Sequence, residues 1–276
     1  MAIAFDADLG GTFANTSATT LALTTAAAAA ANAKVVVSVG GNAAPTGVTD
    51  SAGTTYRQVS TGIVSGAANV YIFEGDLGAG GLASSSTITA TYGSSIGGRM
   101  VMASSFTGVG TGSASVESSQ TRTQVNATTW ISNGITPAAN NEMVFAAAAS
   151  AGAADATNTA AGGFTGIRSA GAGGSARNWC SEYVIQTTAA TVQATGTWSV
   201  SQAGTDGVNM AVIFSLPTGA PWDKVVAQVF APERQQVMLG PRWMMGAGDA
   251  PADWSTTPPQ VGGGFDVPSL IPTVFS

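Results

Sequence analysis

Histidine is absent from the 276 residues, and cysteine occurs once, as Cys180. The lack of histidine removes the commonest general base and the commonest ligand of transition metals. One cysteine allows neither an internal disulfide nor a cysteine-based metal cluster, and with no histidine to activate it we expect a core residue rather than a nucleophile. The composition therefore predicts a protein that is not an enzyme and holds no cofactor or metal.

Charge is also scarce, because Asp, Glu, Lys and Arg make up only 9% of the chain and the net charge is −6. The basic residues are scattered singly, so no basic patch for nucleic acid or an anionic membrane is expected. The apolar run at residues 21–31 is interrupted by threonines and is too short to span a bilayer. The N-terminus carries Asp6 and Asp8 and lacks the basic region of a secretory signal. We therefore expect synthesis as a soluble cytoplasmic chain.

Apolar residues reach 45% of the chain and cluster in short runs between turns rich in Gly, Ser and Thr. The run at residues 98–108 predicts a central strand of a β-sandwich, because alternate residues fall on two faces and both are small or apolar. One face carries Met100, Met102, Ser104 and Phe106, and the other carries Val101, Ala103 and Ser105.

About a dozen short strands and no convincing helix are predicted before Pro217. Residues 34–39 and 141–149 read as buried strands, and residues 16–24 and 86–92 alternate as half-buried strands do. Residues 123–131 are interpreted as one strand, and residues 109–121 and 150–163 as loops. The pattern predicts an all-β domain over residues 1–216, a jelly-roll-like β-sandwich.

The composition changes at Pro217, because nine of the eleven prolines and three of the six tryptophans lie from there onward. Residues 221–230 are compatible with one short helix, with Pro221 in its first turn. Proline then recurs too often for a helix or a central strand. We therefore predict that residues 217–276 are a long extended C-terminal arm.

Large apolar side chains are spaced along this arm, and they are a liability if left in water. Trp and Met are favoured at the centres of interfaces, so we interpret these residues as binding another subunit, with docking onto their own domain as the alternative. The predicted partner-binding residues are Trp222, Phe230, Met238, Trp243, Met244, Met245, Trp254 and Phe265.

Acidic residues at two turns are the other candidate site. Asp50, Gly53, Glu74 and Asp76 would be a calcium site only with six or more oxygen ligands, and no Asp-x-Asp-x-Asp spacing is present, so a structural turn is expected. Glu74 and Asp76 also suggest the paired carboxylates of glycoside hydrolysis. They lie two residues apart at a strand end, which is common in surface turns, so catalysis is not expected.

The order of features from Val48 to Gly108 resembles a β-sandwich module of bacteriophage virion proteins. The pattern begins with Asp50, Gly53, Tyr56 and Val59, spaced as Asp-x-x-Gly-x-x-Tyr-x-x-Val. An aromatic strand at 70–73, glycines at 78–81, a threonine-rich strand at 87–92 and the strand at 100–108 follow in order. The later strands at 142–146, 183–185 and 210–214 extend the likeness over residues 1–216. It is similar to minor tail or accessory virion proteins of phages with high-GC, actinobacterial-type hosts.

The resemblance implies a structural component of a phage particle, located on the virion. We expect a minor tail protein held by its C-terminal arm to other virion proteins and to its own copies. One alternative is capsid decoration. Another is a module that binds carbohydrate on the host surface, for which Tyr56, Tyr92 and Trp130 would have to be exposed.

Overall fold

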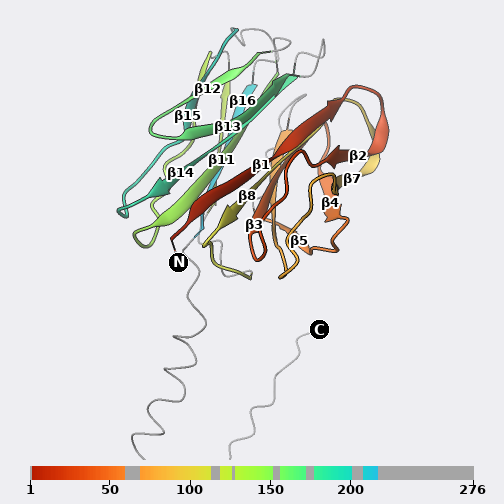
Figure 1. Ribbon diagram of the computed structural model, residues 1–276. Coiled ribbons are helices and arrows are strands. Elements are labelled where there is room, and N and C mark those ends of the chain that lie inside the picture. Colours follow the sequence, from red (N-terminus) through yellow and green to blue (C-terminus); the bar gives the residue numbers. More distant parts are fainter. Residues whose placement is uncertain are drawn as a thin grey trace, which may run out of the picture. The chain divides into compact units, whose positions relative to one another are not determined.

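Sixteen β-strands and no helix make up the described part of the chain (Figure 1). The computed structural model describes residues 2–59, 69–112, 119–125, 128–151, 156–171, 177–200 and 208–216. The chain divides into two compact units, Met1–Val225 and Val226–Ser276, and all these strands belong to the first. The all-β prediction is confirmed. The predicted arm, its eight partner-binding residues and the short helix at 221–230 lie outside the described residues.

The first eight strands form two antiparallel sheets that we call the first sandwich. Its large sheet has the order β1-β8-β3-β6-β5, and its small sheet has the order β2-β7-β4. The strands are β1 (Ala4–Ala14), β2 (Ala18–Thr24), β3 (Lys34–Gly41), β4 (Pro45–Asp50), β5 (Tyr56–Gln58), β6 (Asn69–Asp76), β7 (Thr87–Ile96) and β8 (Arg99–Thr107).

The next eight strands form a second sandwich with the same plan. Its large sheet has the order β9-β16-β11-β14-β13, and its small sheet has the order β10-β15-β12. The strands are β9 (Ser119–Val125), β10 (Thr129–Ile131), β11 (Glu142–Ala151), β12 (Asn158–Ala161), β13 (Thr165–Gly171), β14 (Arg177–Gln186), β15 (Thr195–Trp198) and β16 (Val208–Leu216).

The two sandwiches are copies of one topology, because adding eight to every strand number of the first gives the second. In each copy the first, eighth, third and sixth strands lie side by side in one sheet, and the second, seventh and fourth form the other. This is the strand order of a jelly roll, with the fifth strand moved to the edge of the large sheet. The jelly-roll-like β-sandwich expected over residues 1–216 is thus two jelly rolls in tandem.

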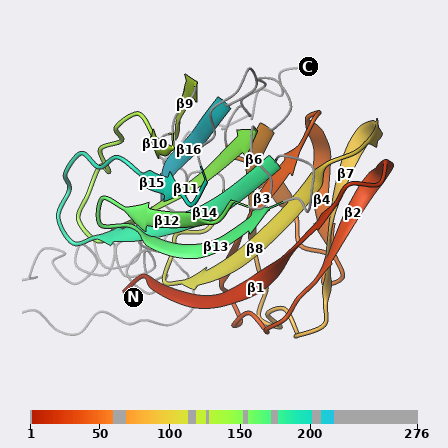
Figure 2. The same cartoon turned by 90° about the horizontal axis from the view of Figure 1, so that it is seen from above.

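Three apolar cores separate four sheets. Val35, Val37 and Val101 of the first large sheet face its small sheet, while Val36 and Met102 face the second sandwich. The core between the two large sheets is completed from β11 and β14 by Met143, Phe145, Ala147, Ala149 and Trp179. A third core, around Trp130 and Trp198, lies inside the second sandwich. The two large sheets therefore face each other in the middle of this unit (Figure 2).

Strands β3, β8 and β11 are apolar on both faces because each large sheet packs against a small sheet on one side and against the other large sheet on the other. Every residue of β3 and β11, and every residue of β8 except Thr107, is buried. The predicted two-faced burial of residues 98–108 is confirmed. β8 lies between β1 and β3, so the central strands of the large sheets are β3 and β11.

At the junction between the sandwiches, Trp179 of β14 packs directly against Gly40 of β3. The Trp179 indole Nε1 donates a hydrogen bond of 3.1 Å to the carbonyl of Asn69. A side chain on Gly40 would overlap the indole ring, so only glycine leaves room for it there. Toward the other end of β3, Phe5 stacks on Tyr183 with ring centroids 5.2 Å apart. The sequence interpretation placed Trp179 and Tyr183 on one face of a strand, and both face this junction.

Three predicted boundaries in the second sandwich were wrong. Residues 123–131 are not one strand, because β9 ends at Val125 in the large sheet and β10 begins at Thr129 in the small sheet. The predicted loop at 109–121 contains the start of β9, and the predicted loop at 150–163 contains β12. Strands β10 and β12 have three and four residues, too few for a periodic pattern to stand out.

Gly40→Ala should destabilise the protein by about 1–3 kcal/mol, because the added methyl group overpacks a closed core against Trp179. Gly47→Ala is the matched control, since a Cβ at Gly47 meets no atom within 4 Å. We expect the control to change the free energy of unfolding by less than about 0.5 kcal/mol. Urea denaturation followed by tryptophan fluorescence measures the stability of both variants. Equal stabilities would contradict the claim that Trp179 requires a glycine at position 40.

Candidate functional site

Four charged side chains converge where β3, β5 and β6 meet at one end of the first large sheet. Lys34 begins β3 and lies directly opposite Asp76 at the end of β6. Glu74 is two residues before Asp76, so it points to the same face of the strand. Arg57 of β5 lies opposite Glu74 on the other side of β6. We call Lys34, Arg57, Glu74 and Asp76 the charge cluster.

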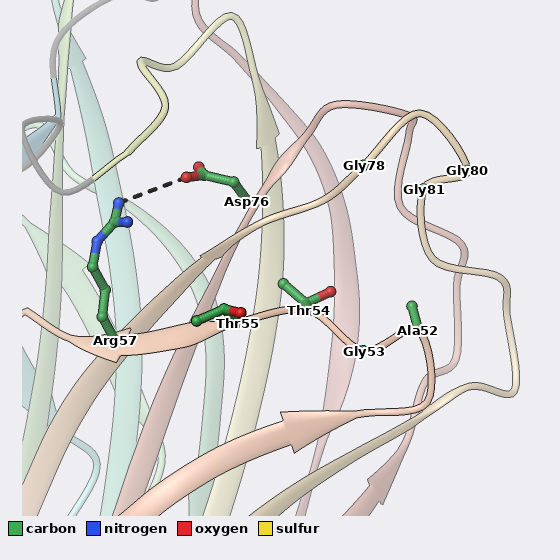
Figure 3. A pocket seen from close by; sticks show the side chains of 9 residues that line it. All are labelled: Ala52, Gly53, Thr54, Thr55, Arg57, Asp76, Gly78, Gly80 and Gly81. Atoms are coloured by element: carbon green, nitrogen blue, oxygen red, sulfur yellow. Dashed lines mark ion pairs between the residues drawn. The ribbon is translucent and has the colours of Figure 1, made fainter.

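The charge cluster is closely connected. Lys34 Nζ lies 2.5 Å from Asp76 Oδ1 and 2.9 Å from Glu74 Oε2. Arg57 Nε donates to Glu74 Oε1 at 2.6 Å, and Arg57 Nη2 lies 3.7 Å from Asp76 Oδ2 (Figure 3). The Gly112 amide donates to the same Asp76 Oδ2 at 2.8 Å. Two cations and two anions thus neutralise one another.

Burial differs sharply between the two sides of the charge cluster. The side chains of Lys34 and Glu74 are 1% and 0% exposed, whereas those of Arg57 and Asp76 are 30% and 26% exposed. Arg57 and Asp76 border a pocket of about 500 Å³ that is otherwise lined by residues 52–55 and by Gly78, Gly80 and Gly81 (Figure 3). Lys34 and Glu74 are therefore the buried half of the charge cluster, and Arg57 and Asp76 are its solvent-exposed half.

Asp50 builds the turn that forms one wall of this pocket. Its Oδ1 accepts hydrogen bonds from the amides of Ala52 and Thr54 at 2.9 and 3.0 Å, and its Oδ2 accepts one from the Tyr56 hydroxyl at 3.0 Å. Gly53 has a φ of 77°, a backbone conformation that glycine adopts without strain. Burial, together with the Asp50 charge, raises the pKa of the Tyr56 phenol. The predicted structural turn at Asp50 and Gly53 is confirmed.

The acidic residues of the two turns do not form a calcium site in this arrangement. Asp50 is engaged in its own turn, and both Glu74 oxygens contact the cations of the charge cluster. Within the described residues no three metal-ligating side chains come together. Glu74 is fully buried, so Glu74 and Asp76 cannot flank a sugar ring in the manner of a glycosidase pair.

A second buried carboxyl, Glu182 of β14, was missed by the sequence interpretation. It is fully buried and lies on the same face of its strand as Cys180, toward the small sheet of the second sandwich. Burial raises the pKa of Glu182 to about 8, and the Asn158 side chain offsets part of this rise. The sequence does contain a sign of this buried carboxyl, because Glu182 alternates with Cys180 and Val184 on one face of the predicted strand.

Cys180 itself lies in the core, as predicted. Burial, with a further contribution from the Glu182 charge, raises the pKa of its thiol well above the usual value. A thiol held in its neutral form is a poor nucleophile.

The aromatic residues required for a glycan-stacking surface are not available for stacking. Tyr92 and Trp130 are buried, and the Tyr92 hydroxyl donates to the Gly40 carbonyl at 2.7 Å. The Trp130 indole donates to Asn158 Oδ1 at 2.8 Å. Tyr56 is partly buried against the core of the first sandwich. The condition set for the carbohydrate-binding alternative is therefore not met by these residues.

Comparison with protein-family models, with curated proteins and with solved structures found no match to this chain. In the part of the chain that the structure describes, no helix has the length and apolar character to cross a membrane.

Replacing Glu182 should change how stability depends on pH. The folded-state pKa is raised from the usual 4.5 to about 8, so unfolding releases a proton between these values and the free energy of unfolding falls as pH rises. This one group contributes a slope of at most about 1.4 kcal/mol per pH unit.

Glu182→Gln, which cannot ionise, should lose this contribution. The melting temperature of the variant relative to that of the unsubstituted protein should therefore rise progressively from pH 5 to pH 8. A difference in melting temperature that stays constant from pH 5 to pH 8 would show that Glu182 is not responsible for the pH dependence of stability.

Proposed function

We propose that this protein is a non-enzymatic structural component of a bacteriophage particle, a minor tail protein displayed on the virion and held there by residues 217–276. The observation that carries the proposal is the tandem of jelly rolls joined through their large sheets. Jelly rolls recur in viral capsid proteins, and also in lectins and cupins. The phage-like order of residues from Val48 to Gly108 favours the viral use of this fold.

Two arginines outside the charge cluster support a structural role, because each binds another part of the same fold. Arg168 of β13 pairs with Asp8 of β1 at 2.6 Å, so the ion pair joins the two sandwiches. Arg99 is buried and donates to the carbonyls of Thr16 and Thr20. Groups held in this way stabilise strand packing.

Residues 217–276 are proposed as the anchor, with other virion proteins or further copies of this chain as partners. Proline limits the freedom of an unbound chain, so ordering the arm on a partner costs less. The stretch from Ala231 onward, about 46 residues, would span on the order of 150 Å if fully extended. Anchors spaced along that length suit a strap across a neighbouring subunit. Capsid decoration would use the same arm, and the position of the protein in the particle distinguishes the two roles.

Deleting residues 231–276, or changing Trp243 and Trp254 to Ala, should reduce the copy number in purified particles at least tenfold. Val200→Ala is the control, because Val200 is an exposed apolar residue of the second sandwich. Quantitative mass spectrometry of particles measures occupancy, and circular dichroism checks that each variant keeps its β-structure. Normal occupancy of the truncated protein would mean that the jelly rolls make the attachment themselves.

A further inference from the structure

The charge cluster holds an amine, a carboxyl group and a second carboxyl group in the arrangement that an internal condensation requires. We propose that Lys34 and Asp76 become joined by an intramolecular isopeptide bond, with Glu74 as the proton carrier. Lys34 Nζ is 2.5 Å from Asp76 Oδ1 and 2.9 Å from Glu74 Oε2. The proposal concerns the first sandwich alone and does not depend on a role in a phage particle.

The fold supplies the proximity that such a reaction needs. Lys34 and Asp76 are direct cross-strand partners at one end of the first large sheet, because β3 and β6 are adjacent antiparallel strands. Reacting groups held at contact distance gain a large effective concentration over groups that meet by diffusion. The amine and the Glu74 carboxyl are also almost fully shielded from solvent, which keeps water away from the proton transfers.

The Asp76 carboxyl is polarised on its other oxygen. The Gly112 amide donates to Oδ2 at 2.8 Å, and the Arg57 guanidinium lies 3.7 Å away. These groups lie where negative charge develops when a nucleophile adds to the carboxyl carbon, so they stabilise that state. Arg57 also binds Oε1 of Glu74, which leaves Oε2 turned toward Lys34. Arg57 is thus a positioning residue, and Glu74 contacts the reacting amine.

The reaction balances without any co-reactant. The Lys34 ammonium gives a proton to Glu74, which passes it to Asp76 Oδ1, and the free amine then attacks Cγ of Asp76. A second proton moves from Nζ through Glu74 to Oδ1, the Cγ–Oδ1 bond breaks, and water leaves as the amide forms. Glu74 is regenerated and nothing is oxidised or reduced. One cation and one anion are lost together, so Glu74 and Arg57 remain as a neutral pair.

The pocket gives the released water a way out. Asp76 borders it (Figure 3) and is partly exposed, whereas Lys34 is almost fully buried. The product would covalently join β3 to β6, two neighbouring strands of the first large sheet.

Intact mass spectrometry of the full-length protein, denatured after purification, is the direct test. We expect a mass below that of the sequence by one molecule of water, and a branched peptide that contains both Lys34 and Asp76. Peptide sequencing separates this product from a succinimide, which has the same mass deficit but joins no second peptide. Asp8→Asn, which alters the ion pair with Arg168, is the matched control and should keep the full deficit.

Lys34→Met, Asp76→Ala and Glu74→Gln should each show the mass of their own sequences. Asp76→Asn guards against variants that fail to fold, because the amide reacts by the same path and should lose ammonia in place of water. An unsubstituted protein with the full sequence mass would overturn the proposal, as would a deficit that persists in Lys34→Met. Complete cross-linking in Glu74→Gln would overturn the role of Glu74.

Discussion

Each large sheet must be apolar on both faces, and much of the rest of this protein follows from that constraint. One face covers a small sheet of the same sandwich, and the other meets the large sheet of the other sandwich. Charged residues are therefore excluded from most positions of β3, β8 and β11, which accounts for part of the low charge of the whole chain. Small side chains such as the run from Ala146 to Ala149 allow close approach between sheets, and Trp179 occupies space left by Gly40.

Several of the charges that enter the interior occur toward strand ends, where backbone or side-chain partners are in reach. Lys34 begins β3, Glu74 is near the end of β6, and Arg99 begins β8. Removing one partner of a buried ion pair leaves the other without compensation in a medium of low polarity, which is costly. Glu182 is different, because burial raises its pKa to about 8 and no ion pair with it is found among the described residues.

The class of fold could be predicted from the sequence because alternation and two-faced apolar runs are local patterns. Residues 98–108 and 34–39 carried that information directly. The duplication could not be read in the same way, because the copies share strand order and not residues: β3 is valine-rich where β11 is alanine-rich. Glu74 and Asp76 were recognised as a candidate pair, but their partners Lys34 and Arg57 were not, since strand register alone brings all four together.

The matching topology of the two halves also has a consequence for symmetry. The same face of the large sheet, the one turned away from the small sheet, is used by both halves at their junction. Two copies of one fold that meet through corresponding faces are the covalent counterpart of a twofold symmetric dimer, in which one patch serves both partners. Because both halves belong to one chain, the two sides of the junction need not be identical, and here Gly40 of the first sandwich receives Trp179 of the second.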